Sequence, residues 1–245
     1  MTTLRKATGL VCVVAVLAVL AVWMNTLRLA TAADEKAAAP APAATGDQQE
    51  VKLKTPKPAF ISTPKKPPPG IVIEPPRKGP RPPFMAPAGT ANLALKCPVN
   101  SSDKEPIIGK LDQVTDGDKE ATDGSWVELG PGLQWVQIDL GKTAEIWGIV
   151  MWHHHGDPRV YKDVVIQIAD DEDFITNVKT VFNNDNDNSS GLGLGKDFMY
   201  FENFEGKLVE TKGVKGRYLR LYSKGNTSDD QNHYTEVEVF GLPAK

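Results

Sequence analysis

Three of the four histidines in this chain stand side by side in the stretch WHHHGDPRVY. In an extended chain His153 and His155 share one face and His154 points to the other, so the three cannot bind one metal ion together. A zinc site would need ligands from elsewhere, and no HxxxH or cysteine pair accompanies them. Two alternatives remain: a ligand-binding rim, or the end of a strand with Trp152 and Tyr161 in the core.

The first alternative, a ligand-binding rim, would suit the recognition of a sugar. A sugar needs planar donors and acceptors for its hydroxyl pairs and an apolar plate for the C–H face of its ring. WHHHGDPRVY offers imidazoles, a guanidinium and aromatic rings, and DDQNHY near the carboxyl terminus offers a similar set. We therefore predict that these two loops form a rim with these ligand-binding residues: Trp152, His153, His155, Arg159, Asn232 and His233.

The motif TDGD could bind a hard cation, because Asp116 and Asp118 flank a glycine in a tight turn. Calcium takes about six to eight oxygen ligands, so backbone carbonyls and a distant carboxylate would have to complete the site. The alternative is a solvated Asx turn. A second acidic stretch, NNDNDNSSG, lacks the bidentate glutamate that closes a calcium loop, and a flexible polar loop is expected there.

Catalysis is not indicated. The sequence contains no nucleophile elbow, metalloprotease helix or recognisable pair of catalytic carboxylates. Acidic residues close to one another are weak evidence in a region that holds 26 of them. We therefore predict that the protein is not an enzyme, and a zinc-dependent enzyme is the least favoured alternative.

Short strands must position these residues. In the segment 134–140, Val136, Ile138 and Leu140 alternate with residues of the opposite face, which is the period of a half-buried strand. Segments rich in Gly, Asn, Asp and Ser separate the strands, and helical spacing is absent. The pattern predicts an all-β antiparallel sandwich with strands in the following segments: 134–140, 145–152, 162–169, 178–182, 198–202, 217–222 and 235–241.

The order of several motifs resembles the discoidin domain, the coagulation factor V/VIII type C family. These motifs are NLAL, VTDGDKEATDGSW, QWVQIDLGK, YKDVVIQIADDEDF, GRYLRLY and HYTEVEVFG, and they cover about residues 91–243. The family is a galactose-binding-like jelly roll that includes many bacterial carbohydrate-binding modules, so the resemblance implies an eight-stranded antiparallel jelly roll with ligand contacts on its end loops. It also implies that Glu236 joins Asp116 and Asp118 in a structural calcium site. The disulfide found in many animal members is absent, since Cys97 has no partner in the exported part.

The chain is unevenly composed before this domain. Residues 1–33 hold an uncharged run of 16 residues after Arg5 and Lys6 and end in small residues, as an export signal does, although an uncleaved membrane anchor remains an alternative. Residues 34–90 contain 14 of the 19 prolines and predict a disordered Pro/Ala/Lys-rich linker. Residues 91–245 carry 16 basic and 26 acidic side chains, and this negative charge argues against nucleic acid as a partner.

Together these features predict an exported, non-catalytic binding module that is periplasmic, secreted or on the cell surface. We expect a monomer that binds a carbohydrate or cell-surface glycan, with membrane contact only through an uncleaved N-terminal segment. A cell-envelope adhesion or protein–protein interaction module of the same fold is the main alternative. Phospholipid binding is disfavoured because the loops are mostly polar.

Overall fold

The computed structural model describes residues 47–64 and 66–244. Within these residues every named strand pairs with its neighbours in the antiparallel sense, and the helical element is a single 3-10 turn, η1. The all-β antiparallel fold predicted from the sequence is therefore confirmed. The elements are β1 (Gln48–Glu50), β2 (Met85–Pro87), β3 (Ala91–Asn92), β4 (Val99–Ser101), η1 (Leu111–Thr115), β5 (Val127–Leu129), β6 (Gln134–Trp152), β7 (Val165–Ala169), β8 (Lys179–Asn183), β9 (Lys207–Ser223), β10 (Asn232–Tyr234) and β11 (Glu236–Pro243).

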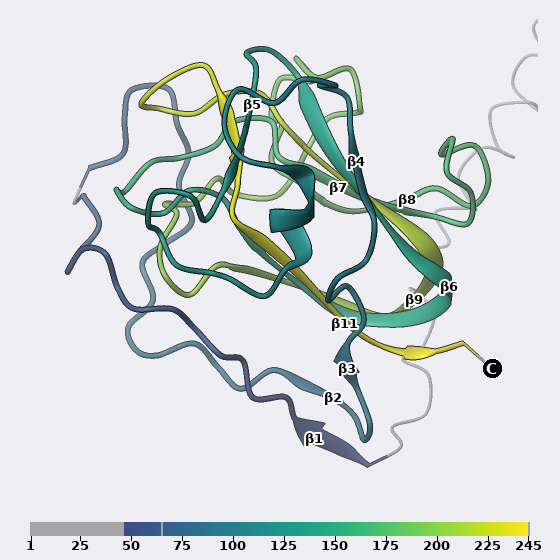
Figure 1. Ribbon diagram of the computed structural model, residues 1–245. Helices are drawn as coiled ribbons and strands as arrows, with labels where there is room; N and C mark the ends of the chain where they lie inside the picture. The colour runs from purple at the N-terminus through teal and green to yellow at the C-terminus, as the bar shows by residue number, and fades with distance from the viewer. Residues whose placement is uncertain (1–46, 65, 245) are drawn as a thin grey trace, which may run out of the picture. The chain divides into compact units, whose positions relative to one another are not determined.

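One long sheet dominates the fold, with the strand order β3-β11-β6-β9-β7-β8 and β4 paired to β6 (Figure 1). The segments 134–140 and 145–152, expected as two strands, run on as the single strand β6 of 19 residues. Its register against β9 shifts between Asp139 and Ala144, next to Gly141 at φ +75°. Because the two longest strands contain such irregularities, the number of strands depends on where they are divided, and the count of eight stays a prediction.

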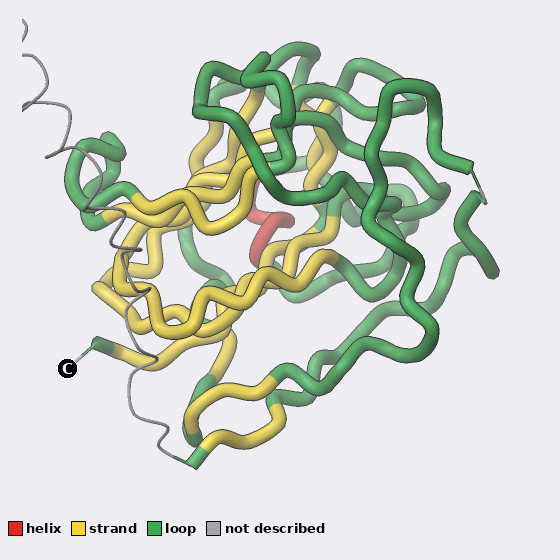
Figure 2. The backbone as a smooth tube through the Cα atoms, turned by 180° about the vertical axis from the view of Figure 1, so that it is seen from behind, coloured by secondary structure: helices red, strands yellow, loops and turns green. Residues whose placement is uncertain are grey.

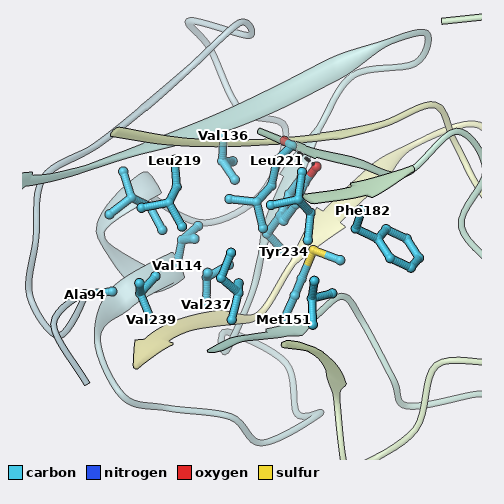
Figure 3. Packing of buried hydrophobic residues seen from close by; sticks show 14 of the residues in the cluster. Ala94, Val114, Val136, Met151, Phe182, Leu219, Leu221, Tyr234, Val237 and Val239 are labelled. Carbon is cyan, nitrogen blue, oxygen red and sulfur yellow. Dashed lines mark hydrogen bonds between the residues drawn. The ribbon is translucent and has the colours of Figure 1, made fainter. Parts of the chain in front are cut away.

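The hydrophobic core lies between the sheet and the layer that holds η1, β5 and β10 (Figure 3). Figure 2 shows η1, in red, among the strands. Val136, Ile138 and Leu140 face into this core, as their alternation in the sequence predicts. Val114 of η1 and Tyr234 of β10 contribute from the other side, and both are fully buried. The strands therefore form a rigid support, and the loops that join them at one end are free to carry a site.

The proline-rich tract is not a disordered linker where the structure describes it. Residues 47–64 and 66–90, here called the strap, begin with β1 and end with β2, which pair with each other. Phe84 and Ala86 are buried in a second hydrophobic cluster with Val150, Trp152 and Phe240. The Phe84 ring lies directly on Gly148, where an added Cβ would stand 2.5 Å from it.

The strap lacks regular secondary structure over most of its length, but it is still ordered, because a segment can be fixed by packing alone. Proline does keep most of the strap out of helix and sheet, as expected. Proline also restricts the unfolded chain, so docking the strap loses less conformational entropy than docking a flexible segment. Its few apolar side chains then suffice to hold it against β6 and β11. Residues 34–46 of the predicted linker, and the predicted signal segment 1–33, lie outside the described residues.

Cys97 is a partly buried thiol packed against the main core. Its Sγ donates to the carbonyl oxygen of Leu93 at 3.1 Å. Burial, and next the charge of Asp139, raise the pKa of this thiol above its ordinary value. Among the described residues there is no helix with the length and apolar character that a membrane crossing requires.

Candidate functional site

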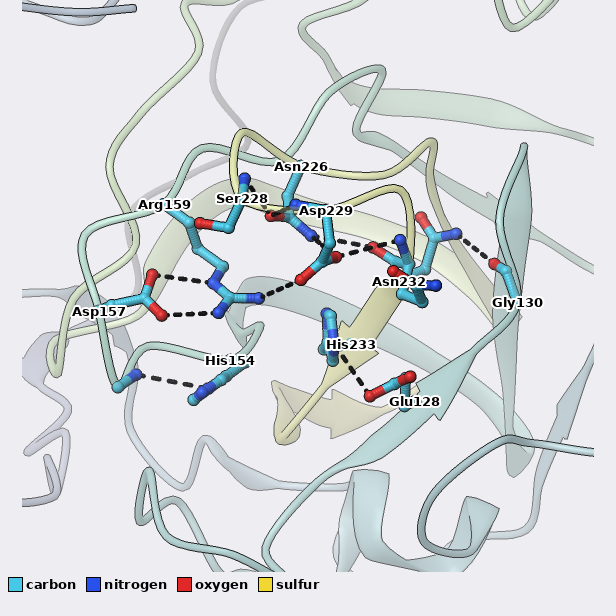
Figure 4. Close-up of polar contacts among 12 residues, drawn as sticks. Glu128, Gly130, His154, Asp157, Arg159, Asn226, Ser228, Asp229, Asn232 and His233 are labelled. Carbon is cyan, nitrogen blue, oxygen red and sulfur yellow. Dashed lines mark hydrogen bonds and ion pairs between the residues drawn. The ribbon is translucent and has the colours of Figure 1, made fainter.

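Two loops predicted to form a rim lie side by side at one end of the domain (Figure 4). The segment after β6 and the loop between β9 and β10 are joined by a bridge between Tyr161 and Asn226. Hydrogen bonds between Val160 and Thr227 extend this pairing. The chain therefore brings the two sequence motifs together, although it uses their side chains differently from the prediction.

Trp152 and His153 are buried structural residues, so their assignment as ligand contacts is wrong. Trp152 has no exposed surface, and its Nε1 donates to the carbonyl oxygen of Phe204 at 3.0 Å. The His153 ring stacks on Tyr161 with centroids 4.1 Å apart. Its Nδ1 lies 2.6 Å from Oε1 of Glu202, and both side chains are fully buried.

His155 and Asn232 are also structural, which corrects two further assignments. The Nε2 of fully buried His155 lies 2.9 Å from the carbonyl oxygen of Lys119 and fixes the preceding loop. Asn232 donates to the carbonyl oxygens of Gly130 and Gly132 and accepts from Ser223 Oγ and the Gly225 amide, so its hydrogen-bonding capacity is used inside the fold. The alternation of the three histidines was predicted correctly, but the face shared by His153 and His155 is the inner one.

Arg159 is held in a fixed orientation at the rim (Figure 4). Its Nε and Nη2 donate to the two carboxylate oxygens of Asp157 at 2.9 and 2.6 Å, and its Nη1 donates to Asp229 at 3.2 Å. Burial opposes the charge of Arg159, but these carboxylates outweigh it and raise the pKa of the guanidinium. The two carboxylate side chains are 46% and 36% exposed, so ligand hydroxyls can reach them.

His154 and His233 stand next to this cluster, with ring centroids 6.0 Å apart. Burial, and then the positive charge of Arg159, lower the pKa of His154 to about 4. Burial also lowers the pKa of His233 to about 4, against the opposing charge of Asp229. Both rings are therefore neutral near pH 7, and each carries one donor and one acceptor nitrogen.

Sequence reasoning missed Trp126, Glu128 and His154 as members of this rim. The Trp126 ring stacks on His154 with centroids 4.4 Å apart and planes 8° apart. Glu128 Oε2 lies 3.3 Å from Nε2 of His233, whose Nδ1 is 2.9 Å from the hydroxyl of Tyr161. Strand β5 supplies Glu128 through its pairing with β10, a contact between distant segments that local spacing does not reveal. We call this set the rim: Trp126, Glu128, His154, Asp157, Arg159, Asp229 and His233.

The three residues predicted to bind calcium lie around one turn. The Gly117 amide donates to Oε2 of Glu236 at 3.0 Å, and the Asp118 amide donates to Oδ1 of Asp116 at 2.7 Å. Glu236 is fully buried, and its Oε1 has no hydrogen-bond partner. Burial, with the charges of Glu238 and Asp116, raises the pKa of Glu236 to about 8. A buried carboxylate oxygen without a donor is a suitable ligand for a hard cation. Among the described residues, however, the acidic ligand atoms that lie within 4.8 Å of one another belong to Asp163, Asp185 and Asp187, and not to these three.

A second acidic cluster joins Asp163, Asp185 and Asp187, whose ligand atoms all lie within 4.8 Å of one another. Their carboxylates already accept hydrogen bonds from the loop itself. Ser189 donates to all three, and Ser190 donates to Asp185. The loop expected to be flexible is therefore closed on its own aspartates.

Comparison with known proteins gives structural neighbours only. No family model and no curated protein matches the chain. The family 89 glycoside hydrolase from Clostridium perfringens in complex with 2-acetamido-1,2-dideoxynojirmycin aligns at 20% identity and a TM-score of 0.47, over 62% of this chain and 15% of the hydrolase. A chitosan-binding module from a chitosanase/glucanase of Paenibacillus sp. IK-5 aligns at 19% identity and a TM-score of 0.46, over 62% of this chain and 99% of the module.

A fucose-binding module of Streptococcus pneumoniae aligns at 19% identity and a TM-score of 0.44, over 61% of this chain and 96% of the module. By their descriptions, two of these three proteins are carbohydrate-binding modules and the third is a glycoside hydrolase. The chain spans only about a seventh of the hydrolase, and at these identities and TM-scores the neighbours identify neither a ligand nor its contact residues.

Proposed function

We propose that the protein is a non-catalytic binding module that recognises a carbohydrate through the rim. The observation that carries this proposal is the fixed position of Arg159 between two exposed carboxylates. A guanidinium and a carboxylate side by side present donors and acceptors in one plane, which matches a pair of neighbouring sugar hydroxyls. Because Asp157 and Asp229 hold the arginine in place, binding costs little side-chain entropy.

The neutral histidines support the same chemistry. His154 offers a hydrogen-bonding nitrogen, Nε2, without a net charge, and neutral donors and acceptors suit a hydroxyl-rich ligand. His233 is 4% exposed, and its nitrogens already face the Tyr161 hydroxyl and Glu128, so it supports the rim from beneath. The stack of Trp126 and His154 adds a partly exposed aromatic surface, against which the C–H face of a sugar ring can pack. Affinity should be weak, since a shallow polar rim buries little area.

Calcium enters this proposal as a structural ion at the turn of Asp116 and Asp118. Glu236 would supply the buried ligand from β11, and the turn would supply carboxylate and carbonyl oxygens. The ion would neutralise the buried carboxylate and fasten the loop before β5 to β11. Its part in function would be to support the rim indirectly, because Trp126 and Glu128 follow this loop.

Export from the cytoplasm remains part of the proposal. It rests on the charged start, apolar run and small residues of 1–33. A position outside the cytoplasm gives access to cell-surface or environmental glycans. Several copies on one surface could raise a weak single-site affinity through avidity.

A glycan array tests the function with the full chain, in the presence of calcium and of a chelator. Probes should include fucose, chitosan oligosaccharides and N-acetylglucosaminyl-α-1,4-galactose, which the structural neighbours bind or were crystallised with. We expect binding to at least one glycan and its loss in Arg159→Ala. Arg217→Ala is the matched control, since Arg217 makes a similar bidentate pair with Asp139 away from the rim.

If no glycan on the array binds the protein, carbohydrate recognition is contradicted. Capture of one specific protein that depends on Arg159 would then favour the protein–protein interaction module. Turnover of a glycan by the purified chain would contradict the non-catalytic assignment.

A further inference from the structure

A cleft of about 640 Å³ opens between the strap and the end loops of the domain. One wall comes from the strap residues Pro69, Gly70 and Ile71. The rest comes from five stretches that are far apart in the sequence, including the acidic loop and the loop between β9 and β10.

The cleft combines polar groups of both kinds with an apolar side. Lys224 Nζ donates to the carbonyl oxygen of Ser189 at 3.0 Å and lies 3.8 Å from Asp163, so the polar floor is held in place. Lys162 and Asp230 also line it, and Asp230 is exposed. Ile71 of the strap adds apolar surface to the lining. A sugar ring carries hydroxyl donors and acceptors beside C–H surface, so this lining is complementary to a sugar.

The cleft and the rim share a loop. Asp229 pairs with Arg159 of the rim, and its neighbour Asp230 lines the cleft. Lys162 follows Arg159 by three residues, a separation of at most about 10 Å along an extended backbone. The Lys224 amide donates to the carbonyl oxygen of Lys162, which ties the two sides of the cleft to the backbone pairing that supports the rim.

The strap wall is anchored on the C-terminal side of Ile71. Ile73 forms a bridge with Met199, the Glu74 amide donates to the Met199 carbonyl oxygen at 2.8 Å, and Glu74 pairs with Lys207 at 2.5 Å. Farther along, Arg81 donates to the carbonyl oxygens of Glu205 and Gly206. The cleft is therefore preformed rather than assembled by a ligand, which lowers the entropy cost of binding.

We propose that this cleft is a second saccharide subsite, which holds a further unit of a glycan chain whose first unit sits on the rim, with the strap as one wall. The inference rests on the proposed function and narrows it to an oligosaccharide. Asp163, Asp187 and Asp230 outnumber the two lysines in the cleft, and the domain carries excess negative charge. The chain should therefore be neutral or bear amino groups, and not carboxylates or sulfates.

The test is calorimetry on the full chain with galactose, N-acetylglucosamine and glucosamine oligomers of one to six units. Affinity should rise with length beyond one unit. Ile71→Ala should weaken binding of the longer oligomers roughly fivefold through lost apolar contact and leave the single unit unchanged. Ile61→Ala is the matched control, since Ile61 is a fully exposed isoleucine of the same strap.

Asp230→Asn provides a second variant that keeps the shape of the cleft and should show the same dependence on length. Equal affinities of Ile71→Ala, Asp230→Asn and Ile61→Ala for every length would overturn the subsite and leave the rim intact. Loss of binding in these variants while Arg159→Ala binds normally would instead place the whole site in the cleft and contradict the rim. Absence of binding to every oligomer would contradict both.

Discussion

The substitution Phe84→Ala measures how much the docking of the strap contributes to the free energy of unfolding of the domain. Phe84 is 3% exposed, its ring meets Phe240 edge-on with centroids 5.9 Å apart, and it covers Gly148. Truncation of a buried phenylalanine to alanine costs about 3–5 kcal/mol. The lower end applies here, because the cluster is small and lies near the surface, so we expect about 3 kcal/mol.

For a folded unit of about 200 residues, the entropy of unfolding near the midpoint is roughly 0.4 kcal/mol per kelvin, so this loss lowers Tm by about 7 °C. The assay is thermal unfolding followed by circular dichroism, with urea denaturation as a second measure. Met85→Ala is the matched control, since Met85 is the next residue of β2 and is 42% exposed. Equal shifts in the two variants would refute the docked strap and restore a disordered linker.

Three further predictions concern titratable groups. In the presence of chelator, the free energy of unfolding should fall as pH rises from about 4.5 to about 8, because folded Glu236, with a pKa of about 8, keeps a proton that the unfolded chain has released. Added calcium, or Glu236→Gln, should remove this slope in thermal melts across pH. The same slope with and without calcium would argue against the ion. Glycan binding should be constant from pH 8 to pH 5.5 and fall toward pH 4 as His154 and His233 gain protons, whereas a midpoint near 6.5 in a binding titration would show that these pKa values are not lowered. Cys97 should react slowly with a thiol reagent at pH 8 in the native protein and rapidly after unfolding, since burial raises its pKa; equal rates would contradict its burial.

The strands could be predicted because their signal is local. Alternation of apolar residues fixed which side of 134–140 faces the core, since a period of two survives any tertiary arrangement. The contact of Glu236 with the turn of Asp116 came from the family resemblance and not from the spacing of the residues. The hydrogen bond from the Gly117 amide to Glu236 joins these distant segments.

The site could be predicted only as a pair of loops. Alternation shows that His153 and His155 share a face, but it does not show which face points inward, and the polar character of histidine suggested the wrong one. His153 is buried because Glu202, from a distant loop, provides a partner. The prediction of a disordered linker was wrong for a related reason. Proline content predicts the local backbone conformation, whereas docking of the strap depends on the packing of Phe84 against residues distant in the sequence.

The most direct test of the central claim is a crystal structure of the full chain with the best glycan from the array. The rim predicts a sugar with hydroxyls within hydrogen-bonding distance of Arg159 and its ring beside Trp126 and His154. A glycan bound elsewhere, for example on the sheet face around Trp135, with the rim free of ligand, would contradict the account.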